Sequence, residues 1–331
     1  MLLKIRENLI DEAVSALLLR NIFRYRNHPP AYLAPTNLPP ACFSGCREEF
    51  YATNRQLNSE DLRQGQRNVS ADWERREFSF ESEVRTPFAE SNRVLCTHWS
   101  KPGHRNKRII LGMDGIVQFR DTWFQTLAEQ VLDAGWDVVM MDAPFNHRRT
   151  PAGYRPGQLI LRGNFYHFLN VGRQSILDLK SLAEFYQRQG MELALVGVSL
   201  GGWAVTTVSQ LLNHIQFLHA VTPPLEMSWM LREGGAIVRA AWSGLSQDSL
   251  DWEQMQFQMR PLSPYHYPLT VKPQQVCFHT ARYDRFVSTE RIVEYADRVG
   301  AGSQEWPRGH IKATCRRDIA VEIGRQIRDR S

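Results

Sequence analysis

Long hydrophobic runs are missing from this sequence, and cysteines are scarce in it. No uncharged apolar window of about 18 residues occurs, so we expect no transmembrane helix. Charged side chains interrupt the apolar residues at the start of the chain, which argues against a secretory signal peptide. Five cysteines, at positions 42, 46, 96, 277 and 315, are too dispersed for a disulfide framework. Since Cys42 and Cys46 have no second pair, zinc binding is not expected either. We therefore expect a cytoplasmic protein without a metal or an organic cofactor.

A strong excess of charge of one sign is also missing. The net charge is +5 over 331 residues, and 43% of the residues are hydrophobic, which is typical of a globular chain with a sizeable core. Basic side chains gather at 101–108 and from residue 316 onward. Neither cluster is interleaved with aromatic residues, so we interpret both as solvated faces and expect no nucleic-acid partner. A weak attraction to anionic membrane surfaces is left open.

The first part of the chain differs from the rest. Residues 3–26 place apolar side chains at helical spacing, which predicts an amphipathic helix. We expect it to pack on the main domain, with contact to a membrane surface or a partner as the alternative. Residues 28–45 are rich in proline and predict an irregular arm, and the polar stretch 46–75 predicts a helical or loose connection. We therefore separate an N-terminal extension, 1–76, from a main domain, 77–331.

Within the main domain, strand patterns alternate with helical ones. We expect strands at 77–84, 93–99, 107–111, 136–141, 193–198, 217–221, 276–280 and 303–306. We expect helices at 121–134, 163–188 and 200–213, and a last one carrying Cys315, Ile319, Ile323 and Ile327. This alternation predicts an α/β protein with a mostly parallel central sheet flanked by helices. Residues 223–272 show no strand pattern and are rich in Trp and Met, so we interpret them as a helical cap insertion.

One serine lies directly between a predicted strand and a predicted helix. The strand at 193–198 runs into Gly197-Val198-Ser199-Leu200-Gly201, and a helix follows at once. A serine on such a sharp turn projects its hydroxyl from the sheet edge, and the glycines two residues before and after it let neighbouring chain approach. This context, more than the five-residue string, makes Ser199 a candidate nucleophile.

These residues carry a resemblance to a known family. The chain from about residue 77 onward resembles the α/β-hydrolase superfamily. Within it, Asp142-Ala-Pro-Phe-Asn-His-Arg-Arg-Thr-Pro-Ala-Gly153, together with the Ser199 turn, is similar to a bacterial branch related to the abhydrolase-18-like proteins. The resemblance implies a serine hydrolase whose acid and histidine follow the nucleophile in that order, each after a late strand.

That order selects the two partners of the serine. Asp284 follows the strand at 276–280, and His310 follows the last short strand, so they are the candidate acid and base. His147 is the main rival for the base, because it follows the strand that ends near Asp142. Glu226 and Asp251 are the alternatives for the acid, since some members of the superfamily place the acid after the preceding strand.

An oxyanion hole needs two N–H donors. The backbone of Leu200 supplies one, and the loop after 107–111 supplies the other. The superfamily usually has His-Gly in that loop, whereas this chain has Asp114-Gly115, which places the donor at Ile116, with Met113 as the alternative. Asp114 either orients the loop by hydrogen bonds or biases the site against anionic groups.

Taken together, these residues predict cleavage of an ester by a carboxylesterase or lipase-like enzyme, with a small-molecule or lipid-like substrate. The candidate pocket residues are Met113, Asp114, His147 and Trp229. Peptidase, thioesterase and acyltransferase chemistry would use the same triad. An alternative of another class is a non-catalytic α/β-hydrolase that acts as a binding or scaffold module through its N-terminal helix and proline-rich arm.

Overall fold

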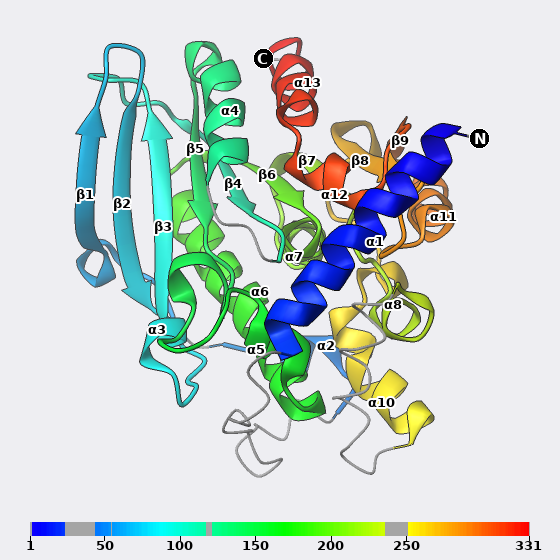
Figure 1. The fold of residues 1–331 in the computed structure, drawn as a ribbon. Helices are drawn as coiled ribbons and strands as arrows, with labels where there is room; N and C mark the ends of the chain where they lie inside the picture. Colours follow the sequence, from blue (N-terminus) through cyan, green and yellow to red (C-terminus); the bar gives the residue numbers. More distant parts are fainter. Residues whose placement is uncertain (1, 24–43, 54, 117–120, 236–250, 331) are drawn as a thin grey trace.

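A single twisted sheet forms the centre of the molecule (Figure 1). The computed structural model describes residues 2–23, 44–53, 55–116, 121–235 and 251–330. In this part of the chain, nine strands pair in the order β1-β2-β3-β5-β4-β6-β7-β8-β9. The strands are β1 (Arg63–Val69), β2 (Glu74–Glu81), β3 (Arg93–Ser100), β4 (Arg108–Met113), β5 (Trp136–Met141), β6 (Glu192–Val198), β7 (Ile215–Val221), β8 (Val276–Ala281) and β9 (Gly302–Trp306).

Most of this sheet is parallel. Strands β5, β4, β6, β7, β8 and β9 pair in parallel, whereas β1, β2 and β3 form an antiparallel extension on the β5 side. The predicted α/β architecture with a mostly parallel sheet is confirmed. Because parallel strands end at the same edge, the loops after β4, β5, β6 and β8 meet at one place on the molecule.

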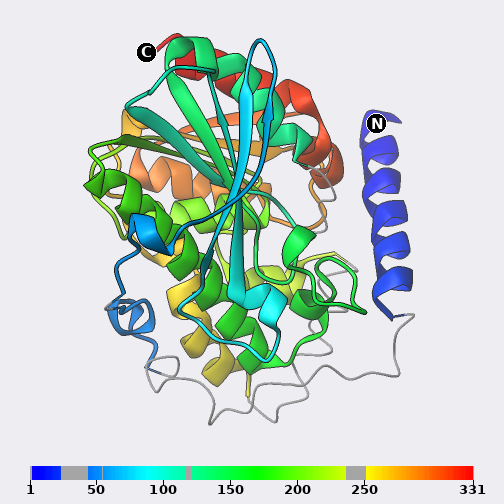
Figure 2. The same cartoon turned by 90° about the vertical axis from the view of Figure 1, so that its left-hand side faces the viewer.

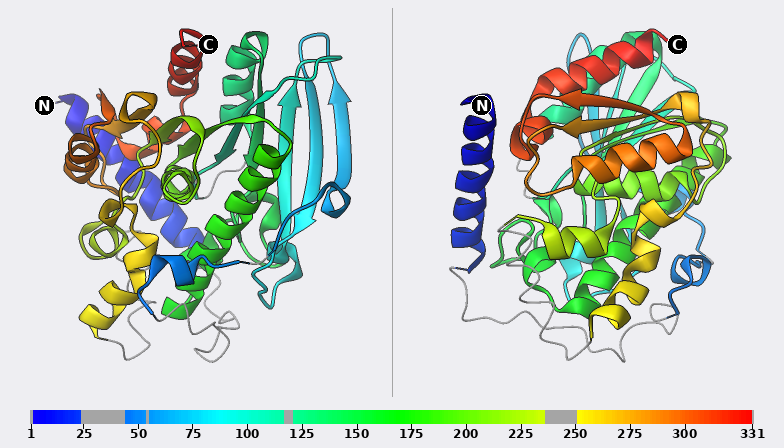
Figure 3. Two further views of the ribbon diagram at one scale, coloured as in Figure 1. Left: turned by 180° about the vertical axis from the view of Figure 1, so that it is seen from behind. Right: turned by 90° about the vertical axis from the view of Figure 1, so that its right-hand side faces the viewer.

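Helices cover both faces of the sheet (Figure 3). The longer ones are α4 (Thr122–Val131), α6 (Phe165–Arg188), α7 (Leu200–Ser209), α11 (Thr289–Val299) and α13 (Arg317–Arg328). Helices α4 and α13 pack on each other and on one face, while α6, α7 and α11 pack on the other. Short helices connect them: α2 (Arg47–Phe50), α3 (Ala89–Asn92), α5 (Gln158–Arg162), α8 (Met227–Glu233), α10 (Trp252–Met259) and α12 (His310–Cys315).

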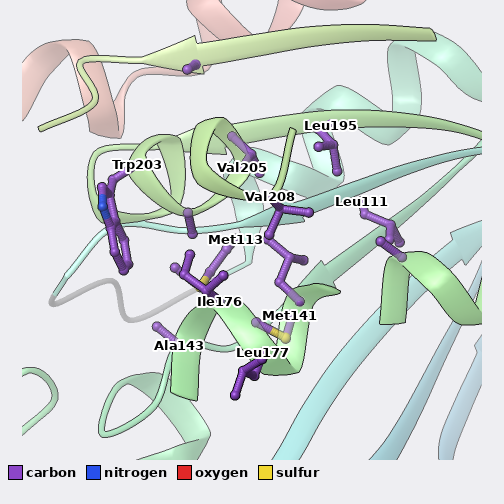
Figure 4. Packing of buried hydrophobic residues seen from close by; sticks show 14 of the residues in the cluster. Leu111, Met113, Met141, Ala143, Ile176, Leu177, Leu195, Trp203, Val205 and Val208 are labelled. Atoms are coloured by element: carbon purple, nitrogen blue, oxygen red, sulfur yellow. The ribbon is translucent and has the colours of Figure 1, made fainter. Parts of the chain in front are cut away.

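Helix α7 is the best buried of these, and it starts directly after the predicted nucleophile, Ser199. Its side chains Val205 and Val208 lie in the same cluster as Leu111 of β4 and Leu195 of β6 (Figure 4), and all four are fully buried. Burying a side chain of this size stabilises the fold by about 1.5–3 kcal/mol. The helix is apolar on most sides because the sheet lies below it and α6 beside it. This packing holds the start of α7 rigidly at the sheet edge.

The sheet begins earlier than the sequence predicts. The expectation of a helical or loose connection over 46–75 is wrong for its second half, because β1 pairs with β2 from Arg63 onward, before the predicted start of the main domain at residue 77. All seven residues of β1 are exposed. An exposed edge strand needs no alternation of apolar and polar residues, so the sequence carries no pattern that would predict it. The last predicted helix is also divided, since α12 ends at Cys315 and α13 begins at Arg317.

The N-terminal helix forms as predicted, but it packs through a different face (Figure 2). Helix α1 (Leu2–Phe23) lies outside the main body, in contact with α5 and α12. The helix does not pack through all of its apolar side chains, because Leu3, Ile5, Leu9 and Leu17 are 37–63% exposed. The side chains of Glu7, Asp11 and Ser15 are buried in their place.

The described parts of the insertion at 223–272 are largely helical. They contain α8, α10 and the 3-10 turns η7 (Arg260–Leu262) and η8 (Pro264–His266), as predicted for a cap. Residue Trp242, which the sequence also places in the cap, lies outside the described residues. No helix among the described segments is long and apolar enough to cross a membrane.

Candidate active site

The predicted nucleophile occupies a strained turn between β6 and α7. Ser199 has φ 52° and ψ −115°, a left-handed conformation that costs a non-glycine residue about 1–3 kcal/mol. The surrounding structure enforces this conformation. The Ser199 N–H donates to the Val221 carbonyl oxygen at 2.8 Å, and the Ser199 carbonyl accepts from the Trp203 N–H at 3.0 Å. The side chain is partly exposed at the carboxyl edge of the sheet.

Two glycines make this turn sterically feasible. A Cβ atom at Gly197 would overlap the backbone of Gly201, and a Cβ at Gly201 would overlap the carbonyl of Met113 at the end of β4. Main-chain atoms cannot be displaced as a flexible side chain can. Both positions therefore require glycine because neighbouring backbone approaches closely, which is the reason expected from the sequence.

Ser199, His310 and Asp284 form one continuous hydrogen-bonded chain. The Ser199 Oγ lies 3.0 Å from His310 Nε2, and His310 Nδ1 lies 2.7 Å from Asp284 Oδ2. The other carboxylate oxygen of Asp284 accepts from the N–H groups of Phe286 and Val287 at 2.8 and 2.9 Å. With the carboxylate as acceptor, Nδ1 of His310 carries a proton and Nε2 presents its lone pair to the serine.

The electrostatic surroundings of His310 favour its protonated form. Burial of the ring lowers its pKa, but the negative charge of Asp284, the hydrogen bond to that carboxylate and the charge of Asp11 together outweigh burial. The pKa of His310 is therefore raised above 6.5. The raised pKa means that the surroundings stabilise the protonated imidazole of His310, and the Asp284 carboxylate contributes most to this stabilisation.

The rival residues are engaged elsewhere. His147 Nδ1 lies 3.0 Å from Asp142 Oδ2, and this contact raises the pKa of His147. The carboxylate of Glu226 caps α8 by accepting from the Ser228 N–H at 3.2 Å. Asp251 in the same way caps α10 and is exposed. Of the three candidate carboxylates, Asp284 is the one that contacts His310.

The loop after β4 approaches the nucleophile at Gly115. A Cβ on Gly115 would lie 3.2 Å from the Ser199 Cβ, so the two backbones are nearly in contact. The Gly115 carbonyl accepts from Asn146 Nδ2 at 2.8 Å. In a trans peptide the C=O and the next N–H point in opposite directions, so this bond also sets the direction of the Ile116 N–H. The alternative donor, Met113, lies within β4 and is paired on both sides.

Comparison with solved structures decides the fold. No protein-family model and no curated protein matches the chain. Acetyl xylan esterase 1 from Thermoanaerobacterium sp. JW/SL YS485 is similar over 80% of this chain and 87% of its own, with TM-score 0.58 and 14% identity. The S-formylglutathione hydrolase from Agrobacterium tumefaciens is similar over 80% of this chain and 96% of its own, with TM-score 0.53 and 13% identity. The chain has the α/β-hydrolase fold.

In the loop after β4, Asp114 stands where the resemblance to the α/β-hydrolases implies a histidine before the glycine. The Asp114 Oδ1 accepts from the Gly115 N–H at 2.8 Å, so the side chain orients the loop, one of the two predicted roles. Its other oxygen, Oδ2, is buried and has no hydrogen-bond partner among the described residues. Burial raises the pKa of Asp114 to about 7, although the bond from Gly115 acts in the opposite direction.

Asp114→Asn is therefore expected to stabilise the protein at alkaline pH. The folded-state pKa of about 7 exceeds the ordinary value of 3.8, so wild-type stability falls as pH rises through that window. Asparagine keeps the acceptor for Gly115 and removes the titration. We expect a gain of about 1–3 kcal/mol in unfolding free energy near pH ~8, and a much smaller gain near pH ~5. Urea unfolding at both pH values measures this, and a gain independent of pH would contradict it.

The loop after β5 contains Asn146, a residue that the sequence did not single out. A buried ion pair anchors the loop: Arg149 Nη2 lies 2.9 Å from Asp178 Oδ2 of α6, with both side chains at most 1% exposed. Next to it, Arg148 contacts both carboxylate oxygens of Asp142, at 2.8 and 3.0 Å. An amide in an irregular loop has no periodic signal, so only the three-dimensional contact reveals the role of Asn146.

A small apolar cavity of about 20 Å³ lies next to the elbow on the α6 side. It is lined by Ile160, Phe168, Val171, Gly172, Ser175, Leu200, Trp203, Met227 and Leu262. Of the predicted pocket residues, Met113 is buried in the core, and Trp229 does not line this cavity. Asp114 and His147 lie in the loops after β4 and β5, as described above.

Away from the triad, one described cluster has side chains of metal-binding type: His219 and Cys277, side by side on β7 and β8, and His279. The Trp306 indole N–H donates to His279 Nδ1 at 3.4 Å, so a neutral His279 carries its proton on Nε2, which lies 3.1 Å from His219 Nδ1. Burial lowers the pKa of His279 to about 4 and that of His219 well below 6.5. A metal would have to break the hydrogen bond that joins these two nitrogens.

Proposed function

We propose that the protein is a serine hydrolase that cleaves an ester of a small or lipid-like molecule. The observation that carries this proposal is the chain of contacts from Ser199 Oγ through His310 to Asp284, at 3.0 and 2.7 Å. A serine hydroxyl is a weak nucleophile unless a base removes its proton, and that base needs a third group to hold its orientation. The three residues supply these roles in the order typical of the fold.

In the proposed reaction, the Ser199 oxygen attacks the ester carbonyl carbon while its proton passes to His310 Nε2. The carbonyl oxygen becomes an oxyanion, and the N–H groups of Leu200 and Ile116 donate to it. His310 then gives its proton to the departing alcohol, which leaves an acyl group on Ser199. A water molecule attacks this acyl-enzyme, its proton passes to His310, and the carboxylic acid and the free serine are released.

The size of the apolar cavity supports a short acyl group. A space of about 20 Å³ holds little more than one water molecule or methyl group. The walls include the apolar side chains of Met227 and of Leu200, the residue after Ser199, and such walls favour the hydrocarbon end of an acyl chain over a charged group. We therefore propose acetyl esters as better substrates than long-chain esters.

A panel of p-nitrophenyl esters of increasing acyl length tests the proposal. We expect hydrolysis of the acetate, with kcat/KM lower by about tenfold or more for octanoate, since longer chains exceed the cavity. A fluorophosphonate probe is expected to label wild type and not Ser199→Ala. The matched control is Ser209→Ala, at the far end of α7, which is expected to leave labelling unchanged.

The alternatives predict other outcomes. Folded wild type that is neither labelled nor active on any ester would overturn the enzyme proposal and favour a binding or scaffold module. Labelling together with cleavage of p-nitroanilides, but not of esters, would identify a peptidase. Faster hydrolysis of octanoate than of acetate would contradict the short acyl pocket and leave the esterase assignment standing.

A further inference from the structure

The buried face of α1 is polar, and it contacts the start of α12, where His310 lies. Asp11 accepts two backbone hydrogen bonds there, from the N–H of His310 at 2.9 Å and from that of Ile311 at 3.1 Å. One turn earlier on α1, Glu7 accepts from the Gly309 N–H at 3.2 Å and from Lys312 Nζ at 2.7 Å. Residues near one end of the sequence thus hold the catalytic histidine near the other.

These contacts satisfy groups that α12 leaves open. The first N–H groups of a helix have no partner within the helix and normally find a capping side chain. The residue at the cap position of α12 is Gly309, and it has no side chain for this purpose. Asp11 and Glu7 supply the missing acceptors from another element.

The fit between the two elements is close. A Cβ at Gly309 would lie 2.7 Å from Asp11 Oδ2, so the carboxylate reaches the backbone only because residue 309 is glycine. The side chains of Asp11 and Glu7 are both 1% exposed. Buried carboxylates are costly unless they are paired or hydrogen-bonded. Every acceptor contact described above is directed at residues 309–312, the cap and first turn of α12.

We propose that Asp11 is a positioning residue for His310, acting from α1 through the backbone N–H groups at the start of α12. The proposal rests on the proposed function in one respect, namely that His310 is the base of the triad. Asp11 does not contact Ser199. It fixes the backbone that carries the imidazole, and its negative charge faces the positive charge that the imidazole acquires.

The charged groups around the imidazole come from two elements. Asp284 approaches from the loop after β8 and Asp11 from α1, and both raise the pKa of His310 against the opposing effect of burial. One turn away, Glu7 pairs with Lys312 at 2.7 Å and with Arg6 at 3.1 Å. Removing the charge of Asp11 is therefore expected to lower the pKa of His310, which a purely structural contact would not do.

Asp11→Asn tests this, because the amide keeps the shape and removes the charge and one acceptor. Asp11→Ser is the second variant, with a short hydroxyl acceptor, in case the first folds poorly. Glu12→Gln is the matched control, since Glu12 is the next residue of α1 and is exposed, with only a surface pair to Arg285 at 3.3 Å. The His310 ring is titrated by NMR in protein with 13C-labelled histidine, and its signal is assigned with His310→Gln.

We expect a downward shift of the His310 pKa in both Asp11 variants and none in Glu12→Gln. With p-nitrophenyl acetate, the acidic limb of kcat/KM should move to lower pH, and kcat should fall by about tenfold because the imidazole is held less firmly. An unchanged pKa in both folded Asp11 variants overturns the proposal. An inactive wild type would contradict the proposed function. The NMR titration needs no turnover, so it would still decide whether Asp11 shifts the pKa of His310.

Discussion

His310→Ala is expected to lower kcat by about 10⁴- to 10⁶-fold, with a much smaller effect on KM. Without the imidazole, the proton of Ser199 has no acceptor, and the departing alcohol has no donor. The residual rate should come from the oxyanion donors at Leu200 and Ile116, which do not depend on the base. Purified wild type and variant assayed with p-nitrophenyl acetate give the two rate constants.

The double variant Ser199→Ala/His310→Ala sharpens this expectation. Residues that act as one unit show strongly non-additive losses, so the double variant should be no slower than the slower single variant. Two independent losses that multiply would show that Ser199 and His310 do not act together, despite the 3.0 Å contact. In wild type, activity should rise with pH through a value above 6.5, because only the neutral imidazole accepts a proton and its pKa is raised.

Gly201→Ala is expected to have the largest effect on stability, a loss of more than about 3 kcal/mol of unfolding free energy. The new Cβ would overlap the carbonyl of Met113, and neither partner can move without disturbing β4 or α7. Strand β4 lies inside the sheet and α7 packs on it, and both are buried. Chemical unfolding monitored by circular dichroism measures the loss, and esterase activity should disappear with it.

The control for this substitution is Gly302→Ala on the edge strand β9. There the nearest atom to a new Cβ is the Val276 carbonyl oxygen at 3.3 Å, which a small shift of the edge can relieve. We expect a change within about 1 kcal/mol. If Gly201→Ala were as mild as this control, close backbone approach would not be what requires the glycine at the elbow.

The places of Ser199 and Asp284 were predictable because each follows a buried parallel strand, β6 or β8, and apolar strands leave a clear signal. His310 follows the largely exposed edge strand β9, so its selection also needed the order of nucleophile, acid and histidine that the resemblance implies. The elbow glycines followed from the same geometry. Asp114 was noticed as a departure from the superfamily pattern, but its bond to Gly115 required coordinates.

What the sequence did not show depends on polar contacts between distant segments. Strand β1 is exposed along its whole length and therefore shows no alternation. In α1, the apolar residues were expected to face the main domain. At the contact with α12, however, Asp11 accepts hydrogen bonds from backbone N–H groups. Asn146 is one amide in a loop, and no spacing rule connects it with Gly115. Such contacts have no period along the chain.

The bonds between α1 and α12 also bear on the order of synthesis and folding. The bonded residues are 299 to 302 positions apart, so forming these bonds closes a loop of about 300 residues. During translation, Asp11 emerges early and has no partner until residues 309–311 leave the ribosome. The sheet from β4 to β8 and the Ser199 turn are made before that moment. We expect a nascent chain to form the Ser199 turn first, and to fix the final position of His310 only when α1 meets α12.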